Sequence, residues 1–359
     1  MNIIYVGPLD YGGTCLQRLK ALEQLGHRVL PVDTCPPEVA ARQRHFHDRV
    51  WRKLLGPRDL AGANARILRL VREHKPRILW VDKGLTIRPD TLQRAKAMAP
   101  GLVRVSYSPD DMLNPQNQSR RYVAGIPLYD LHVTTKSYNV AELKEAGAPR
   151  VLFVDNAFCP FVHRPLPLTA AEKERFGGQV GFIGQFEEDR AEHLTFLAEQ
   201  GILVKVWGRW PRRWRQHHPN LLVMGAPVWG DDYARAICAF DINLAFLHKG
   251  NRDRQTTRSI EIPACGGFML AERTSEHLRL FREGVEAAFF GSREELLEKV
   301  RYYLSHPEER LQIAAAGRRR CLDHGYSNAD RLQAVLQHLT NNLIRLWMPC
   351  ASMYRLKDS

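Results

Sequence analysis

Short apolar runs alternate with longer segments of helical periodicity along most of the chain. The run at 2–6 precedes a glycine-bearing turn, leucines near helical spacing from Leu16 to Leu25, and a second apolar run at 28–33. Short apolar runs between turn residues are typical of buried strands, and leucines three to four positions apart are typical of a helix. The opening of the chain therefore predicts a β-α-β unit, as in doubly wound sheets.

The same alternation continues as far as residue 154. It predicts a strongly basic helical segment at 40–74, a helix from Pro89 to just before Pro100, and strands at 77–81, 102–107, 130–135 and 151–154. Over 156–178 the pattern lapses, and its prolines and Gly-Gly pair predict a linker between two domains.

A second α/β series follows the linker. It predicts strands at 179–184, 202–207, 221–224, 240–246, 267–271 and 287–290, and helices at 188–200, 231–239, 256–265, 275–283, 292–304, 307–323 and 329–347. The fold class is thus α/β, with Rossmann-like domains at 1–155 and 179–328 and a helix within 329–359 that packs back on the first domain. Ligands bind beyond the carboxyl ends of such strands, so we expect a ligand cleft shared by the two domains.

Charge and cysteine usage limit the classes of ligand and the cellular compartment that we expect for the protein. The net charge of the 359 residues is +13, which favours phosphate-bearing ligands, an anionic membrane surface or nucleic acid, although a solvated basic surface is an equal alternative. The cysteines are scattered without a C-x-x-C pair, which argues against a disulfide framework or a zinc site. No run approaches the ~18 apolar residues of a membrane span, and the N-terminal run lacks the parts of a signal peptide. We expect a cytoplasmic protein.

The richest stretch for chemistry is 251–272, NRDRQTTRSIEIPACGGFMLAE. A helix is predicted to begin near Thr256, and the free N–H groups of a helix start favour an anion. Arg254 and Arg258 add planar donors suited to a diphosphate. Glu261 lies one turn further on, and its carboxylate is suited to accept from both hydroxyls of a ribose. The alternative is a helix with solvated arginines, in which Glu261 pairs with Arg258.

Several segments resemble a known family. RSIEIPACGGFMLAERTSEHLRLFREGVEAAFF (258–290), EELLEKVRYYL (294–304) and AAAGRRRC (314–321) resemble the C-terminal domain of group 1 glycosyltransferases, specifically the CgeB-like (spore-maturation-protein-like) proteins. YSPDDM (107–112) and VGFIGQFEEDR (180–190) are also similar to this family. The resemblance implies a GT-B fold, an enzyme that transfers a hexose-like sugar, and a nucleotide-sugar donor, for which we expect UDP, held mainly by the second domain without a bound metal.

The resemblance also implies roles for individual residues. Retaining members carry an E-x7-E motif, and Asp253 and Glu261 have that separation, with Asp in place of the first Glu. Glu261 corresponds to the ribose-binding carboxylate and Asp253 to a catalytic position near the donor sugar. Arg190 and Arg258 match the diphosphate contacts, and Gly184 allows the backbone to approach the donor. The predicted donor set is completed by Arg254, Thr257 and Gly208.

The first domain offers acceptor-side candidates. Asp110 and Asp111 follow a predicted strand and are candidates for the general base toward an acceptor hydroxyl, although Pro-Asp-Asp is equally good turn chemistry. Gly12 and Gly13 form a turn that points to the same edge and approaches donor or acceptor. Asp82 and Lys83, after another predicted strand, are further candidates at this edge.

Two segments leave the partners open. Residues 209–218, RWPRRWRQHH, interleave arginine with tryptophan, as in stacking surfaces for nucleic acid, a rim of the nucleotide site or a solvated face. The segment 343–349, LIRLWMP, either touches a membrane surface peripherally or belongs to the terminal helix.

The sequence thus predicts a retaining glycosyltransferase that acts on a glycan, lipid-linked or protein acceptor in envelope or spore-surface decoration. The alternatives are a non-catalytic GT-B protein that binds glycans or nucleotides, and a DNA-directed glycosyltransferase.

Overall fold

The computed structural model describes residues 1–43, 45, 47–48, 51 and 56–344. Contacts within the chain divide it into two units. Unit 1 comprises Met1–Asp155 and the segment that begins at Asn328, and unit 2 comprises Asn156–Ser327. All twelve predicted strands are present, each within two residues of its predicted bounds.

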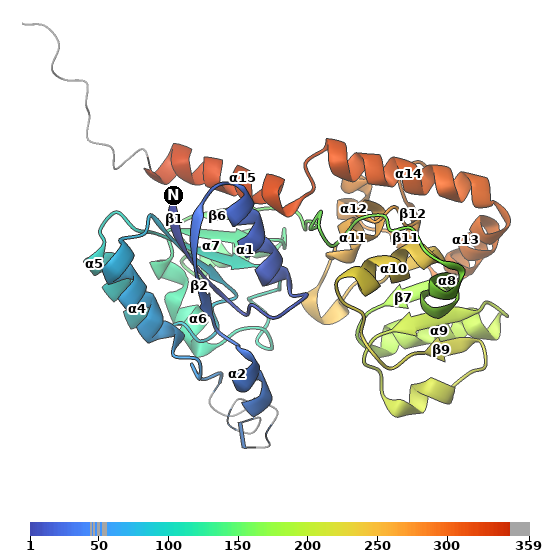
Figure 1. The fold of residues 1–359 in the computed structure, drawn as a ribbon, viewed down its shortest axis with the longest axis horizontal. Coiled ribbons are helices and arrows are strands. Elements are labelled where there is room, and N and C mark those ends of the chain that lie inside the picture. The colour runs from blue at the N-terminus through green and yellow to red at the C-terminus, as the bar shows by residue number, and fades with distance from the viewer. Residues whose placement is uncertain (44, 46, 49–50, 52–55, 345–359) are drawn as a thin grey trace, which may run out of the picture. The chain divides into compact units, whose positions relative to one another are not determined.

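Unit 1 is built on a six-stranded parallel sheet (Figure 1). Its strands, in spatial order, are β2 (Arg28–Asp33), β1 (Asn2–Gly7), β3 (Ile78–Asp82), β4 (Val103–Ser108), β5 (Leu131–Thr134) and β6 (Val151–Phe153). The chain order reverses at β1, which has β2 on one side and β3 on the other. The carboxyl ends of β1 and β3 therefore form the switch point at which open α/β sheets bind ligands.

Alternating side chains cover the two faces of this sheet. Tyr5 and Trp80 are register partners that pack beneath α1 (Thr14–Gln24) and α15 (Asn328–Leu339). Their neighbours Leu79 and Val81 pack on the other face, beneath α4 (Ala63–His74) and α5 (Pro89–Met98). Shorter helices complete the unit: α2 (Pro37–Arg42), α6 (Arg120–Gly125), η1 (Ile126–Leu128) and α7 (Asn139–Glu145).

The prediction of one helical segment over 40–74 is wrong. The described residues contain α2 and α4, separated by a connection in which Gly56 and Gly62 adopt positive φ angles of 80° and 67°. The Asp59 carboxylate accepts hydrogen bonds from the backbone N–H groups of Ala63 and Asn64, at 2.8 and 2.9 Å. In a continuous helix these N–H groups would bond to carbonyls of the preceding turn. Here the Asp59 side chain satisfies them instead, so a new helix, α4, begins at Ala63.

Unit 2 contains a second six-stranded parallel sheet. Its strands, in spatial order, are β12 (Ala288–Phe290), β11 (Met269–Glu272), β10 (Phe240–Ala245), β7 (Gly178–Ile183), β8 (Val204–Trp207) and β9 (Leu221–Val223). This is the Rossmann order, and its switch point lies between the carboxyl ends of β7 and β10. Helices cover both faces of this sheet: α9 (Glu188–Glu199) and α13 (Arg293–Ser305) pack on one face, and α10 (Asp231–Ala239), α11 (Arg258–Ala264) and α12 (Ser275–Leu280) pack on the other.

The segment predicted as a linker, 156–178, lies in unit 2 and contains a helix that the periodicity did not predict. This helix, α8 (Ala170–Phe176), begins with a capping box in which Thr169 and Glu172 exchange side-chain and backbone hydrogen bonds. Phe176 at its end is buried against Trp207. The T-x-x-E spacing was the available signal, but a helix of seven residues carries too little apolar periodicity to stand out.

The chain ends, in its described part, with α14 (Pro307–Asp323), α15 and the short π-helix η4 (Thr340–Ile344). The prediction that a terminal helix returns to the first domain is confirmed, because α15 packs against α1 through Leu332, Val335, Leu336 and Leu339. The predicted helix end at 347 and most of the segment 343–349 lie outside the described residues. Among the residues described, no helix is both long and apolar enough to cross a bilayer.

Candidate functional site

The switch point of unit 2 carries two arginines that bind the ends of neighbouring strands. Arg190, in the first turn of α9, is 4% exposed, and its guanidinium donates to the carbonyl of Leu247, just after β10, at 3.0 Å. Its other terminal nitrogen donates to the carbonyl of Gln185 at 3.2 Å and pairs with Glu187 at 2.7 Å. Arg258, the first residue of α11, donates from Nε to the carbonyl of Ile183 at the end of β7.

The two guanidinium groups lie close enough to influence each other. Burial is the main cause that lowers the pKa of Arg190; Glu187 opposes it, Arg258 adds to it, and Asp253 opposes it. Positive charge is therefore concentrated where burial already makes it unfavourable, and an anion placed here would be favoured. The predicted pair, Arg190 and Arg258, is thus brought to one switch point by the fold, at the carboxyl ends of β7 and β10.

Glu261 is buried on α11 and held by two side chains from distant positions. Its Oε2 accepts from the hydroxyl of Tyr233 at 2.6 Å, and its Oε1 lies 3.6 Å from Nε2 of His163. The backbone N–H of Cys159 donates to Nδ1 of His163 at 3.0 Å, which assigns the ring proton to Nε2, the nitrogen that faces Glu261. Burial lowers the pKa of His163, although the charge of Glu261 opposes this shift. The carboxylate retains lone pairs for further donors.

The sequence did not single out Tyr233 or His163. Tyr233 lies on the apolar side of α10, and His163 lies in the segment predicted as a linker. Only the tertiary structure reveals that both reach Glu261.

The remaining donor-side candidates surround the start of α11. This helix begins at Arg258 rather than at Thr256 and has seven residues, so it is shorter than the helix predicted at 256–265. Thr257 precedes it in an αR conformation without a side-chain capping bond. Asp253 lies in the preceding loop, where its backbone N–H donates to the carbonyl of His248 at 3.3 Å. The carbonyl of Arg254 accepts from the Thr274 hydroxyl at 2.6 Å, and its side chain is exposed.

Gly184 and Gly208 pack directly against each other after β7 and β8. A Cβ on Gly208 would lie 2.0 Å from the carbonyl oxygen of Gly184, so no other residue fits there without displacing the turn. The same carbonyl accepts from Nε1 of Trp210 at 3.1 Å. A Cβ on Gly184 would lie 2.4 Å from the Phe182 ring. Each glycine therefore has a sufficient structural reason that is independent of any ligand.

The candidates of unit 1 gather at the carboxyl ends of β1, β3 and β4. Gly12 has a positive φ of 80°, which lets the chain turn into α1 after Gly13. Lys83 forms an ion pair of 2.6 Å with Asp110, and both side chains are about one-third exposed. Asp111 is fully buried; its Oδ1 accepts from Nδ2 of Asn139 at 2.9 Å and from a backbone N–H of its own turn. This burial supports the turn alternative for Asp111 and leaves Asp110 as the accessible carboxylate.

A charged cluster centred on the candidate Asp82 lies beneath this edge, and sequence reasoning did not identify its other members, Tyr5 and Arg18. Asp82, at the end of β3, accepts from the Tyr5 hydroxyl at 2.6 Å and from Nε of Arg18 at 2.7 Å, and all three side chains are buried. The Arg18 guanidinium also lies 4.6 Å from the centre of the Tyr107 ring. The sequence signal for Arg18 was its place on the apolar face of the first helix.

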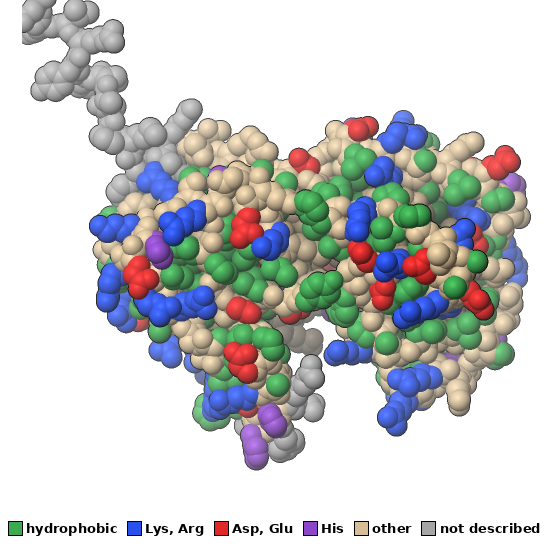
Figure 2. Space-filling model, in the orientation of Figure 1, with side chains coloured by type: hydrophobic (Ala, Val, Ile, Leu, Met, Phe, Trp, Pro, Cys, Tyr) green, Lys and Arg blue, Asp and Glu red, His purple; other side chains and the backbone are tan. Residues whose placement is uncertain are grey.

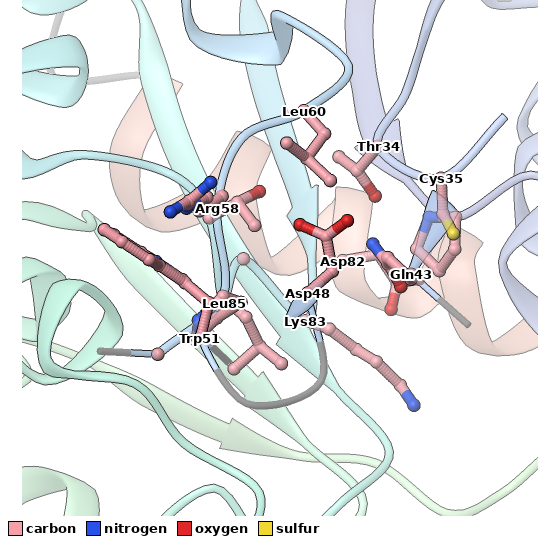
Figure 3. Close-up of a pocket in the computed structure, with 15 residues that line it drawn as sticks. Thr34, Cys35, Gln43, Asp48, Trp51, Arg58, Leu60, Asp82, Lys83 and Leu85 are labelled. Atoms are coloured by element: carbon pink, nitrogen blue, oxygen red, sulfur yellow. The ribbon is translucent and has the colours of Figure 1, made fainter. Parts of the chain in front are cut away.

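A hollow of about 150 Å³ opens beside this cluster, at the ends of β1, β2 and β3. Pro8, Thr34 and Lys83, each just beyond a strand, contribute to its lining. Figure 3 shows Trp51 and Arg58 on one side of the hollow and Thr34 and Cys35 on the other; the Arg58 guanidinium lies 3.2 Å from the centre of the Trp51 ring. The hollow therefore combines aromatic, cationic and hydroxyl groups at the switch point of unit 1.

Residues 190–337 match the family model described as "Glycosyl transferase-like". The match begins at Arg190 and includes Arg258 and Glu261. No curated protein sequence shows significant similarity to the chain. This part of the chain is therefore similar to glycosyltransferase-like domains, in agreement with the predicted enzyme class.

Solved structures show the fold. Anabaena Alr3699/HepE, in complex with UDP and glucose, is 13% identical with a TM-score of 0.64, over 95% of this chain and 100% of that chain. Sucrose-phosphate synthase from Thermosynechococcus elongatus is 12% identical with a TM-score of 0.67, over 95% and 99%. UDP-GlcNAc 2-epimerase from Neisseria meningitidis, bound to UDP-GlcNAc, is 12% identical with a TM-score of 0.55, over 95% and 100%. The predicted GT-B fold of two Rossmann-like domains is confirmed.

Proposed function

We propose that this protein transfers a sugar from a UDP-sugar donor to an acceptor hydroxyl. The observation that carries the proposal is the convergence of Arg190, Arg258 and the buried Glu261 at the switch point of unit 2. Guanidinium groups held in place by backbone carbonyls are preorganised for the diphosphate that leaves in the transition state. The Glu261 carboxylate would accept from the ribose hydroxyls. The UDP and UDP-glucose bound to HepE support the choice of nucleotide.

In unit 1, the proposed acceptor lies in the hollow at the ends of β1, β2 and β3. Asp110 is the proposed general base, because its carboxylate is partly exposed whereas Asp111 is buried. Burial opposes the charge on Lys83, but Asp110 outweighs it and raises the pKa of the lysine, so Lys83 stays cationic beside the base. A fixed ammonium at this position would also bind an anionic acceptor.

The proposal extends to stereochemistry and setting. Asp253 and Glu261 keep the spacing of the retaining motif. Burial lowers the pKa of Arg190 and the charge of Asp253 opposes that shift, which supports a second carboxylate near the proposed diphosphate contacts. We therefore propose retention at the anomeric carbon. The resemblance to CgeB-like proteins supports a role in envelope or spore-surface decoration, and a metal-free reaction stays a prediction.

The test is thermal unfolding with UDP, GDP, ADP and TDP. We expect UDP to stabilise the protein most, and Glu261→Gln to weaken UDP binding at least ~10-fold, since each charge-assisted bond contributes ~1.5–3 kcal/mol. Glu199→Gln, an exposed carboxylate at the end of the same unit's α9, is the matched control and should bind as the wild type does. Equal UDP binding by Glu261→Gln, or no nucleotide effect, would show that the site is assigned wrongly.

A non-catalytic binding protein is the second candidate, favoured by the Asp at position 253 in place of the family's Glu. The 2-epimerase fold match also shows that GT-B proteins with a UDP-sugar need not transfer the sugar to an acceptor. Incubation with UDP-sugars and analysis by mass spectrometry separates these cases. Without acceptor, a transferase should slowly hydrolyse the donor and release UDP. An epimerase should convert the sugar to its epimer, and a binding protein should leave the UDP-sugar unchanged.

A further inference from the structure

In the arginine–tryptophan run at 209–218 the tryptophans are buried in the core and the arginines are exposed to solvent. Trp210 and Trp214 are 6% and 7% exposed and belong to the core of unit 2. The arginines that alternate with them, on and before η2 (Arg212–Gln216), are exposed: Arg209, Arg212, Arg213 and Arg215. In Figure 2 blue side chains protrude at η2, the short yellow-green helix below β9 in Figure 1.

The tryptophans hold this turn rigidly against the sheet. Their rings meet edge to face at 5.9 Å, and the ring of Phe186 lies 5.3 and 5.6 Å from them. Because both indoles are buried, they cannot stack on bases, which is what single-stranded nucleic-acid surfaces require of their aromatic residues. The exposed chemistry of the run is therefore that of guanidinium groups alone.

The charges of these arginines are little compensated. Arg213 is 4.0 Å from Glu188, and both side chains are about two-thirds exposed, so solvent screens the pair. Within the described residues, Arg209, Arg212 and Arg215 form no ion pair or hydrogen bond through their guanidinium groups. The surface is therefore a concentrated positive field, in which the exposed Glu188 is the acidic partner of one arginine, Arg213.

Exposed apolar side chains lie on the loop that Arg215 contacts. Arg215 lies over the loop after β9, because a Cβ on Gly225 would be 2.6 Å from its Nη2. The same loop exposes Met224 and Trp229, at 42% and 52%. A cationic surface with neighbouring exposed aromatic and aliphatic groups is the composition of protein faces that lie on anionic bilayers, where indoles enter the headgroup region and arginines bind phosphate.

We propose that this patch, formed by Arg209, Arg212, Arg213, Arg215, Met224 and Trp229, docks unit 2 on an anionic lipid surface. Nε1 of Trp210, within the same run, donates a hydrogen bond to the carbonyl of Gly184. The glycine turn of the proposed donor site would therefore lie close to the lipid surface. The docking does not depend on the proposed transfer reaction, since it uses none of the residues assigned to the donor.

The experiment is sedimentation of the full-length protein with vesicles of phosphatidylcholine, with and without about one-third phosphatidylglycerol. The wild type should bind only the anionic vesicles, with binding that weakens as salt is added. Arg209→Gln/Arg212→Gln/Arg215→Gln should bind roughly 100-fold more weakly, at about fivefold per arginine. Trp229→Ala should weaken binding several-fold, with a loss that salt changes little.

The matched control is Arg66→Gln/Arg69→Gln/Arg72→Gln, which removes the same charge from the exposed side of α4 in unit 1. It should bind anionic vesicles nearly as the wild type does. Equal loss in both triple variants would show that net charge alone attracts the protein, and equal binding to neutral vesicles would show that the arginines are not used.

Binding of single-stranded DNA without vesicle binding would also overturn the proposal. UDP-induced stabilisation should be unchanged in the Arg209/Arg212/Arg215 variant, which separates failure of docking from failure of the donor site.

Discussion

Buried charged and polar side chains in this protein are held by partners that lie far away in the sequence. Asp82 binds Tyr5 and Arg18, which are 77 and 64 positions away. A buried ion pair costs desolvation, and removing one partner of such a pair is strongly destabilising. These three residues therefore stabilise one arrangement of β1, α1 and β3, directly beneath the switch point that the proposed acceptor would occupy. Glu261 depends on Tyr233 and His163 in the same way.

At the same scale, His132 makes stability depend on pH. It is 1% exposed on β5, and its Nε2 donates to the carbonyl of Ile126 at 2.9 Å. Burial lowers the pKa of His132 to about 4, although the bond to Ile126 opposes this, whereas an unfolded histidine titrates near ~6.5. The unfolded chain therefore takes up a proton as the pH falls below ~6.5, and the folded chain does not until about 4, so stability is lost over that window.

We expect His132 to remove about 2 kcal/mol of stability between about pH 7 and about pH 5. In His132→Gln the amide can still donate to Ile126, but this contribution to the pH dependence should disappear. Urea unfolding of both proteins at the two pH values measures the difference. Equal slopes of stability against pH in the wild type and the variant would contradict the assignment.

At the scale of elements, the strands were predictable because fully buried strands are short apolar runs between turn residues. The helices were less so. The basic region 40–74 has helical composition throughout, yet Asp59 caps a new helix start within it. α8 was missed because seven residues are too few to show a periodicity. Local capping, rather than hydrophobic pattern, decides these boundaries.

The last helix, α15, completes the core of unit 1 although it is far from that core in sequence. Leu332 is 2% exposed and packs with the side chains beneath α1. Leu332→Ala should destabilise unit 1 by ~2–5 kcal/mol, the usual range for a large-to-small change in a core. Gln337→Ala, on the exposed side of the same helix, should change stability by less than ~0.5 kcal/mol. Chemical denaturation compares the two; similar losses would mean that α15 does not pack as described.

At the scale of the whole molecule, the two units differ in how the chain builds them. Unit 2 is one continuous segment, Asn156–Ser327, whereas unit 1 needs both its N-terminal part and α15. All residues proposed to bind the donor, apart from the turn Gly12-Gly13, lie in unit 2. Donor binding and the completeness of unit 1 are therefore separable.

We expect the fragment 156–327 to fold alone and to be stabilised by UDP, because it contains its own core and the Arg190–Arg258–Glu261 set. The fragment 1–155 should be poorly soluble, since removal of α15 exposes the apolar surface that Leu332, Val335 and Leu336 cover. Thermal unfolding with UDP and light scattering measure the two outcomes. If the fragment 156–327 folds but UDP does not raise its unfolding temperature, the donor contacts lie elsewhere.

The sequence by itself determined the α/β class, the twelve strands and the stretch around Glu261, because buried strands and glycine-bearing turns are local patterns. It did not determine what each candidate side chain contacts. Only the tertiary structure decided that Asp111 is buried while Asp110 is accessible, and that the tryptophans of 209–218 face the core while the arginines face solvent. Tertiary structure also brought Tyr233 and His163 to Glu261. The physical reason is that burial and hydrogen bonding depend on which distant segments pack together, and neighbouring residues in a sequence carry no record of that.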